Sequence, residues 1–485
     1  MKNKVSYLIG VACLLSYTCT FTSCVNGVDD EYLEQKFTES GGTDNEGEEL
    51  PDLNGDYSIE GDYDLVMTCN GEVLEGKKVI MTVDENNETA SITFAAAQTD
   101  LETVIATAIP GGIGGLVSGW GLKYTGNSPI PGEKEITVTN VPLFKKGTNY
   151  MFKGGYIQSG VYNMNFVGEI EGEKMTIDIN YMLENQKLAG TWKVANANLQ
   201  TSTSYDLSPL WFDWDSKVKV NAGKIYGIIP TLPTYGKVID TYPNDLIRTV
   251  IVASGVMLGD IIGASIDIEN LVVNMLNSVT AQPNGGMYAI YSYSNDFTKP
   301  QWSGEDGMPH NAMRYYYDPE KPDERIYLEL NSGFLINLIE SLATPAEPAA
   351  PSTRADLRDT AKELIALLVP LLEKGIPCEY KLEGDNLSIN IDGIVLRDIL
   401  VKLIAVMNAD EAKEIVDGVI AGLGDFKTNV ESVLQTLPEA LIYQTYDRTT
   451  QQGTGECGPV KLGLKFTKKI TPNKEKGIFR EHHYY

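Results

Sequence analysis

The chain has 485 residues, of which 42% are hydrophobic and 22% charged, and its formal net charge is −27. This length and composition are ordinary for a globular protein of two to four domains with a sizeable core. The acidic balance argues against nucleic acid and anionic lipid as partners, because like charges repel. We therefore expect no nucleic-acid-binding function.

The start of the chain has the pattern of a secretory signal over residues 1–23. A short basic head precedes an apolar stretch, residues 5–15, that is too short to span a bilayer comfortably. Two small side chains, Thr22 and Ser23, stand directly before Cys24, as a signal peptidase requires near its cleavage site. The pattern predicts export from the cytoplasm.

The segment Phe21-Thr-Ser-Cys24 resembles the lipobox of bacterial lipoproteins, which implies that Cys24 is the lipidated first residue of the mature chain. The acids Asp29-Asp-Glu31 resemble the surface-export signal of lipoproteins from the Bacteroidetes. Together these resemblances imply a protein that is lipid-anchored in the outer membrane at the cell surface. The alternatives are an ordinary secretory signal with an incidental cysteine, and a solvated acidic linker behind it.

Acidic residues dominate the stretch behind the anchor. Residues 25–52 hold ten acids and one base and contain almost no aliphatic side chains, so they predict a disordered tether. From residue 53 the sequence becomes strand-like. Residues 63–69 alternate and meet Asn70-Gly71, a strong hairpin signal. Strands at this spacing predict an antiparallel barrel or sandwich.

The second half of the chain mixes strands and helices, so the expected fold class is α+β. Residues 325–330 are typical of a strand, and residues 355–374 predict a helix that Pro370 should kink or end. The expected parts are a signal peptide (1–23), an acidic tether (24–52), a β-rich barrel-like domain (53–187), an α+β domain (188–342), a proline-rich linker or loop (343–352), a helix-rich segment that completes the second domain (353–469) and a tail (470–485).

Three landmarks recur in the same order, so the mixed region could be a duplicated and expanded copy of the first domain. The pairs are "LNGDY" (53–57) with "LAGTW" (188–192), "DLETVIA" (100–106) with "DLIRTVIV" (245–252), and "IEGEKMTIDIN" (170–180) with "LEGDNLSINID" (382–392). Each match alone is weak, because strand entries, helix starts and glycine hairpins are common pieces.

The entry "LNGDY" into a meander of strands also resembles the opening of lipocalin-like barrels in Bacteroidetes lipoproteins. The whole chain, from tether to β-rich units, looks like the uncharacterised cell-envelope lipoprotein families of gut Bacteroidales. This resemblance implies a location and adds little chemistry, since most of those families have no assigned activity.

Cysteine usage indicates no disulfide framework. The signal and the lipid account for the first three cysteines, which leaves Cys69, Cys378 and Cys457. At most one bridge can form from an odd trio, and Cys378–Cys457 is the pair to test. The chain has no CxxC motif, so we expect no structural zinc site.

Catalytic patterns are weak, and we predict a protein that is not an enzyme and needs no cofactor or metal. A histidine-dependent nucleophile would have to rest on His310, which lies in a turn-rich loop. Asp213 and Asp215 could form a glycosidase pair, but the alternation around them is more typical of a structural strand. Residues 71–78 have phosphate-loop spacing, yet they lie between two strand patterns and predict a hairpin turn.

A sugar site needs only flat aromatic side chains with polar groups nearby, and one loop-like region offers both. The candidate ligand-binding residues are Trp302, Asp306, Asn311, Arg314, Tyr315, Tyr316 and Tyr317. The alternative, which we favour, is that these rings, those of Trp302 and the three tyrosines, cover the core and an interdomain seam.

These patterns predict a non-catalytic outer-membrane lipoprotein, surface-exposed or periplasm-facing, that binds a ligand, with a glycan as the first candidate. Two other functions stay open. One is a structural or interaction protein of the envelope. The other is a carrier of an apolar ligand inside a lipocalin-like barrel.

Overall fold

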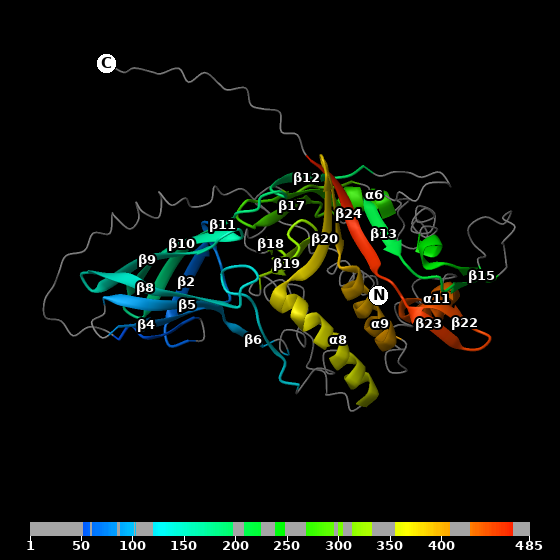
Figure 1. Ribbon diagram of the computed structural model, residues 1–485, viewed down its shortest axis with the longest axis horizontal. Helices are drawn as coiled ribbons and strands as arrows, with labels where there is room; N and C mark the ends of the chain where they lie inside the picture. The colour runs from blue at the N-terminus through cyan, green and yellow to red at the C-terminus, as the bar shows by residue number, and fades with distance from the viewer. Residues whose placement is uncertain are drawn as a thin grey trace, which may run out of the picture.

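The computed structural model describes residues 52–58, 61–84, 88–100, 102, 120–196, 208–224, 238–247, 268–294, 299–303, 313–331, 355–407 and 427–468. Two large, mostly antiparallel sheets form the body of the protein (Figure 1). The first is a half-barrel and the second is a nearly closed barrel. Within the described ranges, no helix is long and apolar enough to cross a bilayer.

The N-terminal sheet has nine strands in the order β1-β4-β5-β8-β9-β10-β11-β2-β3. All neighbours are antiparallel except β11 and β2, which run parallel. The strands are β1 Gly55–Tyr57, β2 Asp64–Cys69, β3 Glu72–Val73, β4 Lys77–Val83, β5 Thr89–Ala96, β8 Glu135–Lys146, β9 Asn149–Gln158, β10 Tyr162–Glu171 and β11 Lys174–Leu183; a separate short pair is β6 Gln98–Asp100 with β7 Lys123–Thr125.

Strict alternation gives this sheet one apolar face, which we call the concave face. In β11, for example, Met175, Ile177 and Ile179 are buried, while the residues between them are partly exposed. Side chains of a strand point to opposite faces in turn, so every second residue of β10 and β11 enters the core. The β-rich character predicted for this part of the chain is therefore confirmed, and its sheet is a half-barrel.

Two glycines let the sheet curve. Gly154 on β9 lies opposite Phe166 on β10, and Gly168 on β10 lies opposite Phe152 on β9. Each phenylalanine ring lies over the glycine of the neighbouring strand, so that a Cβ at Gly168 would lie 2.0 Å from the Phe152 ring. The rings fill the space that the missing side chains leave, a device that supports strongly curved sheets.

The second sheet follows the order β17-β16-β12-β24-β21-β20-β19-β18, with β13 also paired to β24. It nearly closes, because the Tyr315 amide donates to the Gly285 carbonyl (2.7 Å), just before β17. The strands are β12 Gly190–Val194, β13 Leu210–Trp214, β16 Leu276–Ala281, β17 Met287–Tyr291, β18 Met313–Tyr317, β19 Arg325–Leu330, β20 Ile376–Glu383, β21 Asn386–Ile391 and β24 Val460–Lys468. It takes strands from both sides of the expected linker, residues 343–352.

Helices and three short two-stranded sheets, β6-β7, β14-β15 and β22-β23, complete the described fold. Helices α8 and α9 contact β19, β20, β21 and β24 of the second sheet, and α11 contacts β14. Their bounds are α6 Ile268–Met275, α8 Ala355–Lys374, α9 Gly393–Met407 and α11 Lys427–Ile442, and the remaining strands are β14 Val220–Lys224, β15 Val238–Thr241, β22 Tyr443–Asp447 and β23 Gln452–Glu456. Of the two expectations for Pro370, an end of the helix was wrong, since α8 continues through it to Lys374, and a kink stays a prediction.

The three cysteines of the body are buried and form no disulfide, so the suggested Cys378–Cys457 bridge is absent from the structure. The reason is their placement. Cys378 belongs to the main core, which runs through both sheets, whereas Cys457 belongs to a smaller cluster with Trp214 and residues of α9 and α11.

The two sheets share part of their strand order, as the duplication hypothesis predicts, and the duplication itself stays a prediction. The run β1-β4-β5-β8-β9-β10-β11 corresponds to β12-β16-β17-β18-β19-β20-β21. In the second run, β17 and β18 are the two edge strands, which meet where the barrel nearly closes. The strand-entry motif also repeats in detail. The Tyr57 hydroxyl donates to the Leu53 carbonyl (3.0 Å), and the Trp192 indole donates to the Leu188 carbonyl (2.8 Å).

The other two landmark pairs behave differently. The hairpin pair is equivalent, because Gly172 and Gly384 take φ of 60° and 59° at the first turn position between corresponding strands. A glycine at this position suits the two-residue turn of a tight hairpin. The helix pair is not equivalent, since residues 100–106 follow β5 whereas residues 245–252 precede β16.

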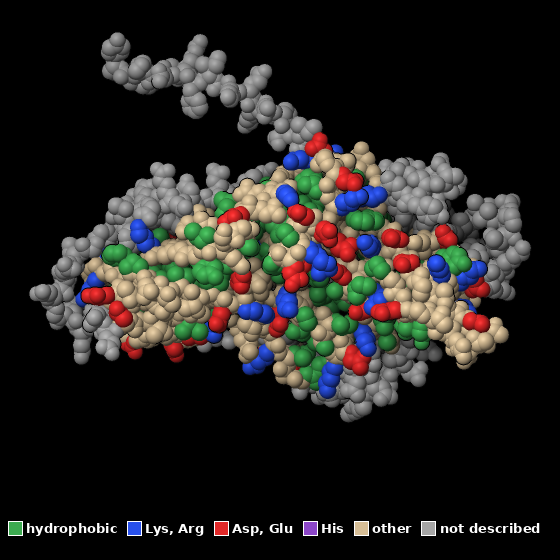
Figure 2. Space-filling view, viewed as in Figure 1, with side chains coloured by type: hydrophobic (Ala, Val, Ile, Leu, Met, Phe, Trp, Pro, Cys, Tyr) green, Lys and Arg blue, Asp and Glu red, His purple; other side chains and the backbone are tan. Residues whose placement is uncertain are grey.

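The outer face of the N-terminal sheet carries exposed apolar side chains. Ile157 of β9, 68% exposed, and Met182 of β11 flank Asn163 of β10 in register. In Figure 2, apolar side chains gather over this sheet, while charged side chains of both signs are spread over the second one.

We predict that Gly168→Ala destabilises the protein by about 1–3 kcal/mol, because the new methyl group must displace the Phe152 ring. Gly126→Ala is the matched control. Its Cβ would meet Ala96 at an ordinary 3.9 Å, so it should be neutral or slightly stabilising. Urea unfolding of both variants measures the difference. Equal stability of the two would contradict this view of the curved sheet.

Candidate functional site

The tyrosines expected in a loop lie on strand β18 instead. The sequence Met313-Arg-Tyr-Tyr-Tyr317 alternates, so Tyr315 and Tyr317 point into the core of the second sheet and Arg314 and Tyr316 point outward. Residues of the N-terminal unit and the end of α8 cover this outward side. The strand therefore lies at the seam between the two sheets.

Tyr315 and Tyr317 are buried and have partners within the chain. Tyr315 is 0% exposed, and its hydroxyl donates to the Gln282 carbonyl (2.9 Å). The Tyr317 hydroxyl accepts a hydrogen bond from the Leu188 amide (3.0 Å). In this structure neither ring offers a face to a sugar, because both pack edge-on against other tyrosines of the core.

Tyr316 is half-buried at the seam. Its ring stacks on Tyr327 with 5.0 Å between centroids and 11° between planes, and its hydroxyl donates to the Lys374 carbonyl at the end of α8. Gly132 of the N-terminal unit packs against the same ring, where a Cβ would lie 2.6 Å away. The ring thus connects β18, β19, α8 and the N-terminal unit.

Arg314 is the centre of a buried polar cluster that joins the two sheets. Its guanidinium donates to Glu329 on β19 (2.9 Å) and to the Pro129 carbonyl of the N-terminal unit. The Asn127 amide donates to the other Glu329 oxygen (2.8 Å). We call Lys77, Asn127, Arg314 and Glu329 the seam cluster.

Lys77 completes this cluster from the first residue of β4. Its ammonium donates to the Asn127 carbonyl (2.8 Å) and lies 3.9 Å from Glu329. All four side chains are buried, so their charges interact through a medium that screens poorly. Removing one partner of such a cluster leaves an unpaired buried charge, a change that costs about 3–5 kcal/mol.

Burial and pairing shift the titration of the cluster. Burial alone would raise the pKa of Glu329, but Arg314 and Lys77 together hold it below its usual value. Burial lowers the pKa of Lys77 to about 8, although Glu329 acts in the opposite direction. Lys77 is therefore mostly protonated at pH 7 and loses its proton at moderately alkaline pH.

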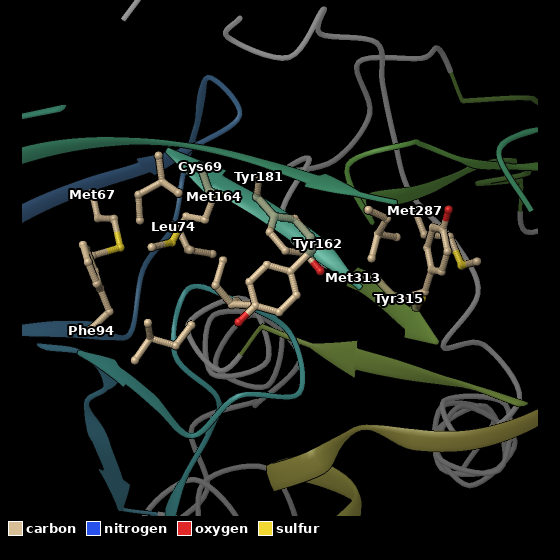
Figure 3. Close-up of a cluster of buried hydrophobic side chains, with 14 of the residues drawn as sticks. Met67, Cys69, Leu74, Phe94, Tyr162, Met164, Tyr181, Met287, Met313 and Tyr315 are labelled. Atoms are coloured by element: carbon tan, nitrogen blue, oxygen red, sulfur yellow. The ribbon is translucent and has the colours of Figure 1, made fainter. Parts of the chain in front are cut away.

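Beside the cluster, the concave face carries tyrosines that differ from those of β18 in the hydrogen bonding of their hydroxyls. Among the residues that the structure describes, the buried hydroxyls of Tyr150, Tyr162 and Tyr181 have no hydrogen-bond partner. Tyr162 and Tyr181 are neighbours, with 5.4 Å between ring centroids. Figure 3 shows them between Met164 and Cys69 on one side and Met287, Met313 and Tyr315 on the other.

The remaining residues of the expected site are dispersed or undescribed. Trp302 is 36% exposed and pairs with Ser292 in an isolated bridge next to β17. Asp306, Asn311 and the expected lipidation site Cys24 lie outside the described residues. A glycan site at Trp302 stays a prediction, but Arg314, Tyr315 and Tyr317 are buried and are not available to a sugar in this structure.

The suggested carboxylate pair also has structural contacts. Asp213 accepts a hydrogen bond from the Asn244 amide (3.1 Å), and Asp215 accepts one from Gln444 (3.2 Å). Phe212 and Trp214 point to the smaller core cluster, as their alternation predicts. Over the described ranges, no three His, Cys, Asp or Glu side chains gather in an arrangement that could hold a metal ion.

Comparisons with family models, curated proteins and solved structures returned no match for this chain.

Sequence reasoning missed Lys77, Glu329 and the three unpartnered tyrosines. The sequence contained one signal for Lys77. In Lys77-Lys-Val-Ile-Met-Thr-Val83, the alternation places Lys77 on the same face of the strand as the buried Val79 and Met81. A lysine on the apolar face of a strand needs a partner. Asn127 and Glu329 could not be named as those partners, because they lie far away along the chain.

We predict that the lowered pKa of Lys77 makes the protein more stable as the pH rises from 7 to 10. Below pH 8 the native and unfolded states both bind the proton, and the native state carries the full penalty of a buried charge. Between pH 8 and 10.5 the unfolded state binds more protons than the native state, so the free energy of unfolding rises. The Lys77 contribution to this rise is roughly 2–3 kcal/mol.

Urea unfolding of wild type, Lys77→Met and Lys77→Arg at several pH values measures this contribution. Neither replacement titrates in this pH range. The free energy of unfolding of wild type should therefore rise by that amount relative to both variants between pH 7 and 10. If the free energy of unfolding changes with pH in the same way in all three proteins, burial does not lower the pKa of Lys77.

Proposed function

We propose that this protein is a non-catalytic binding protein of the cell envelope, and that the concave face of its N-terminal sheet holds an apolar ligand. The observation that carries the proposal is the set of unpartnered hydroxyls on that face. The lipid anchor expected at Cys24 supplies the location, and it remains part of the proposal.

The hydroxyls support a ligand because a buried polar group without a partner is costly. Such a group loses its bonds to water and costs about 1–3 kcal/mol. The tyrosines of the second sheet, by contrast, bond to Gln282 and Leu188. A bound molecule with a polar atom next to Tyr162 and Tyr181 would satisfy what the described chain leaves open.

The lining of the face supports an apolar ligand. Four methionines of this sheet, Met67, Met81, Met164 and Met175, are buried in the core. Methionine is flexible and polarisable, so it adapts to ligands of irregular shape. A half-barrel with such a face is compatible with the lipocalin-like resemblance of the sequence.

A second function, an interaction protein of the envelope, is favoured by the exposed apolar side chains of the outer face, Ile157 and Met182 among them. Exposed apolar patches often mark contact sites. Retention of an envelope partner together with an empty concave face would favour this second function.

The test is binding of the neutral dye Nile red and of 1-dodecanol to the full chain carrying Cys24→Ser, which removes the lipid acceptor. We predict one dye site with a blue-shifted emission, from which dodecanol displaces the dye. Tyr162→Phe should weaken dodecanol about 2- to 10-fold, because one hydrogen bond is lost. Tyr446→Phe, on the exposed hairpin β22–β23, should change nothing.

If wild type binds neither the dye nor dodecanol, buried water is the only hydrogen-bond partner of the tyrosine hydroxyls on the concave face. The proposal then fails.

A further inference from the structure

We infer that the ligand of the concave face is an amphiphile with a carboxylate head, and that the seam cluster binds this head. This inference rests on the proposed function, because it assigns the chemistry of the same ligand. It goes beyond that function by naming the charge that the ligand must carry and the residues that recognise it.

The first argument is charge balance. Within the described part of the chain, the groups that act on Lys77 are Arg314, Glu329 and Cys69. Two of the buried groups, Lys77 and Arg314, are cationic, and Glu329 is the single carboxylate that faces them. The cluster therefore holds one surplus positive charge away from water, which an anion would neutralise.

The neighbouring acidic protons do not supply that anion. Burial raises the pKa of the Cys69 thiol, which opposes the effect of Arg314 and Lys77, so the thiol stays protonated at pH 7. Burial likewise raises the pKa of Tyr181. Both groups are neutral, and the surplus charge of the cluster remains.

The second argument is the set of free donors. Lys77 has three N–H donors, and among the described contacts its ammonium donates one hydrogen bond, to the Asn127 carbonyl. The Tyr181 side chain is 1% exposed, and its hydroxyl is a donor without an acceptor in the described chain. A carboxylate accepts several hydrogen bonds at once, so it suits a place where donors outnumber acceptors.

The third argument is continuity between the cluster and the apolar face. Cys69 and Tyr181 belong to the concave face, and both interact electrostatically with Arg314. Figure 3 shows Cys69 beside Met164 and near Tyr181. An amphiphile could thus place its head at the cluster while its chain lies against the methionines of the sheet.

A singly charged carboxylate fits the surplus charge better than other heads. A phosphate monoester carries close to two negative charges at pH 7 and would leave the cluster negative. A neutral alcohol would satisfy the Tyr181 hydroxyl and leave the charge unbalanced. A quaternary ammonium would add a second uncompensated charge.

The experiment compares three ligands with the same twelve-carbon chain, namely dodecanoate, 1-dodecanol and dodecyltrimethylammonium, as competitors of Nile red at pH 7. We expect dodecanoate to bind at least 10-fold more tightly than dodecanol to wild type, and the ammonium ligand to bind most weakly. Lys77→Met should reduce the preference for dodecanoate to about 2-fold or less.

Lys78→Met is the matched control. Lys78 is the next residue of β4, points outward and pairs with Asp56 (3.4 Å), so its loss should leave the 10-fold preference intact. A second measurement needs no variant. Lys77 loses its proton above pH 8, so the preference of wild type for dodecanoate should fall as the pH rises from 7 to 9.5.

The outcomes separate the two proposals. Equal binding of dodecanoate and dodecanol to wild type would overturn the carboxylate head and leave the apolar site standing. Binding of neither ligand, and no uptake of dye, would overturn both. A preference for dodecanoate that survives in Lys77→Met and does not change with pH would place the head elsewhere and contradict the inference.

Discussion

The buried ion pair between Arg314 and Glu329 is the constraint on which the rest of the structure depends. Both residues lie on the outer side of the second sheet, where charged side chains normally meet water. Here Asn127, Pro129 and Lys77 of the N-terminal unit satisfy them instead. These charges can stay buried because the partners on the other sheet are in place, so the pair fixes how the two sheets meet.

This arrangement explains why two units with a repeated strand order form a single core. The main core runs from the concave face of the half-barrel through Tyr181 and Tyr315 into the second barrel. The seam cluster lies at this passage, and the Lys134–Glu373 ion pair (3.3 Å) adds a contact to α8. The same passage is where the proposed ligand would place its head, so binding and cohesion of the two units depend on the same residues.

Local patterns predicted the parts that depend on neighbouring residues. The alternation of β11, the hairpins at Gly172 and Gly384 and the helix over residues 355–374 were all readable. The helix does not end at Pro370, because α8 is held by contacts with α9 and the second sheet and continues through the proline. The tyrosines of β18 were assigned to a loop-like region because the residues before them are polar and the alternation that marks the strand is only five residues long.

The candidate site was mostly beyond the reach of the sequence. Its charge balance follows from Lys77, Asn127, Arg314 and Glu329, which are separated by up to 252 positions and have no spacing in common. The position of Lys77 on the apolar face of its strand was the one local clue. The unpartnered hydroxyls left no clue at all, since a tyrosine with a partner and one without it look alike in a sequence.

Differential scanning calorimetry of the full chain tests the central claim most directly. If the seam cluster and the shared core join the two sheets into one unit, heating should give one transition whose calorimetric and van't Hoff enthalpies agree. Glu329→Gln should lower the temperature of that single transition. Two separate transitions in wild type, one for each sheet, would contradict the account.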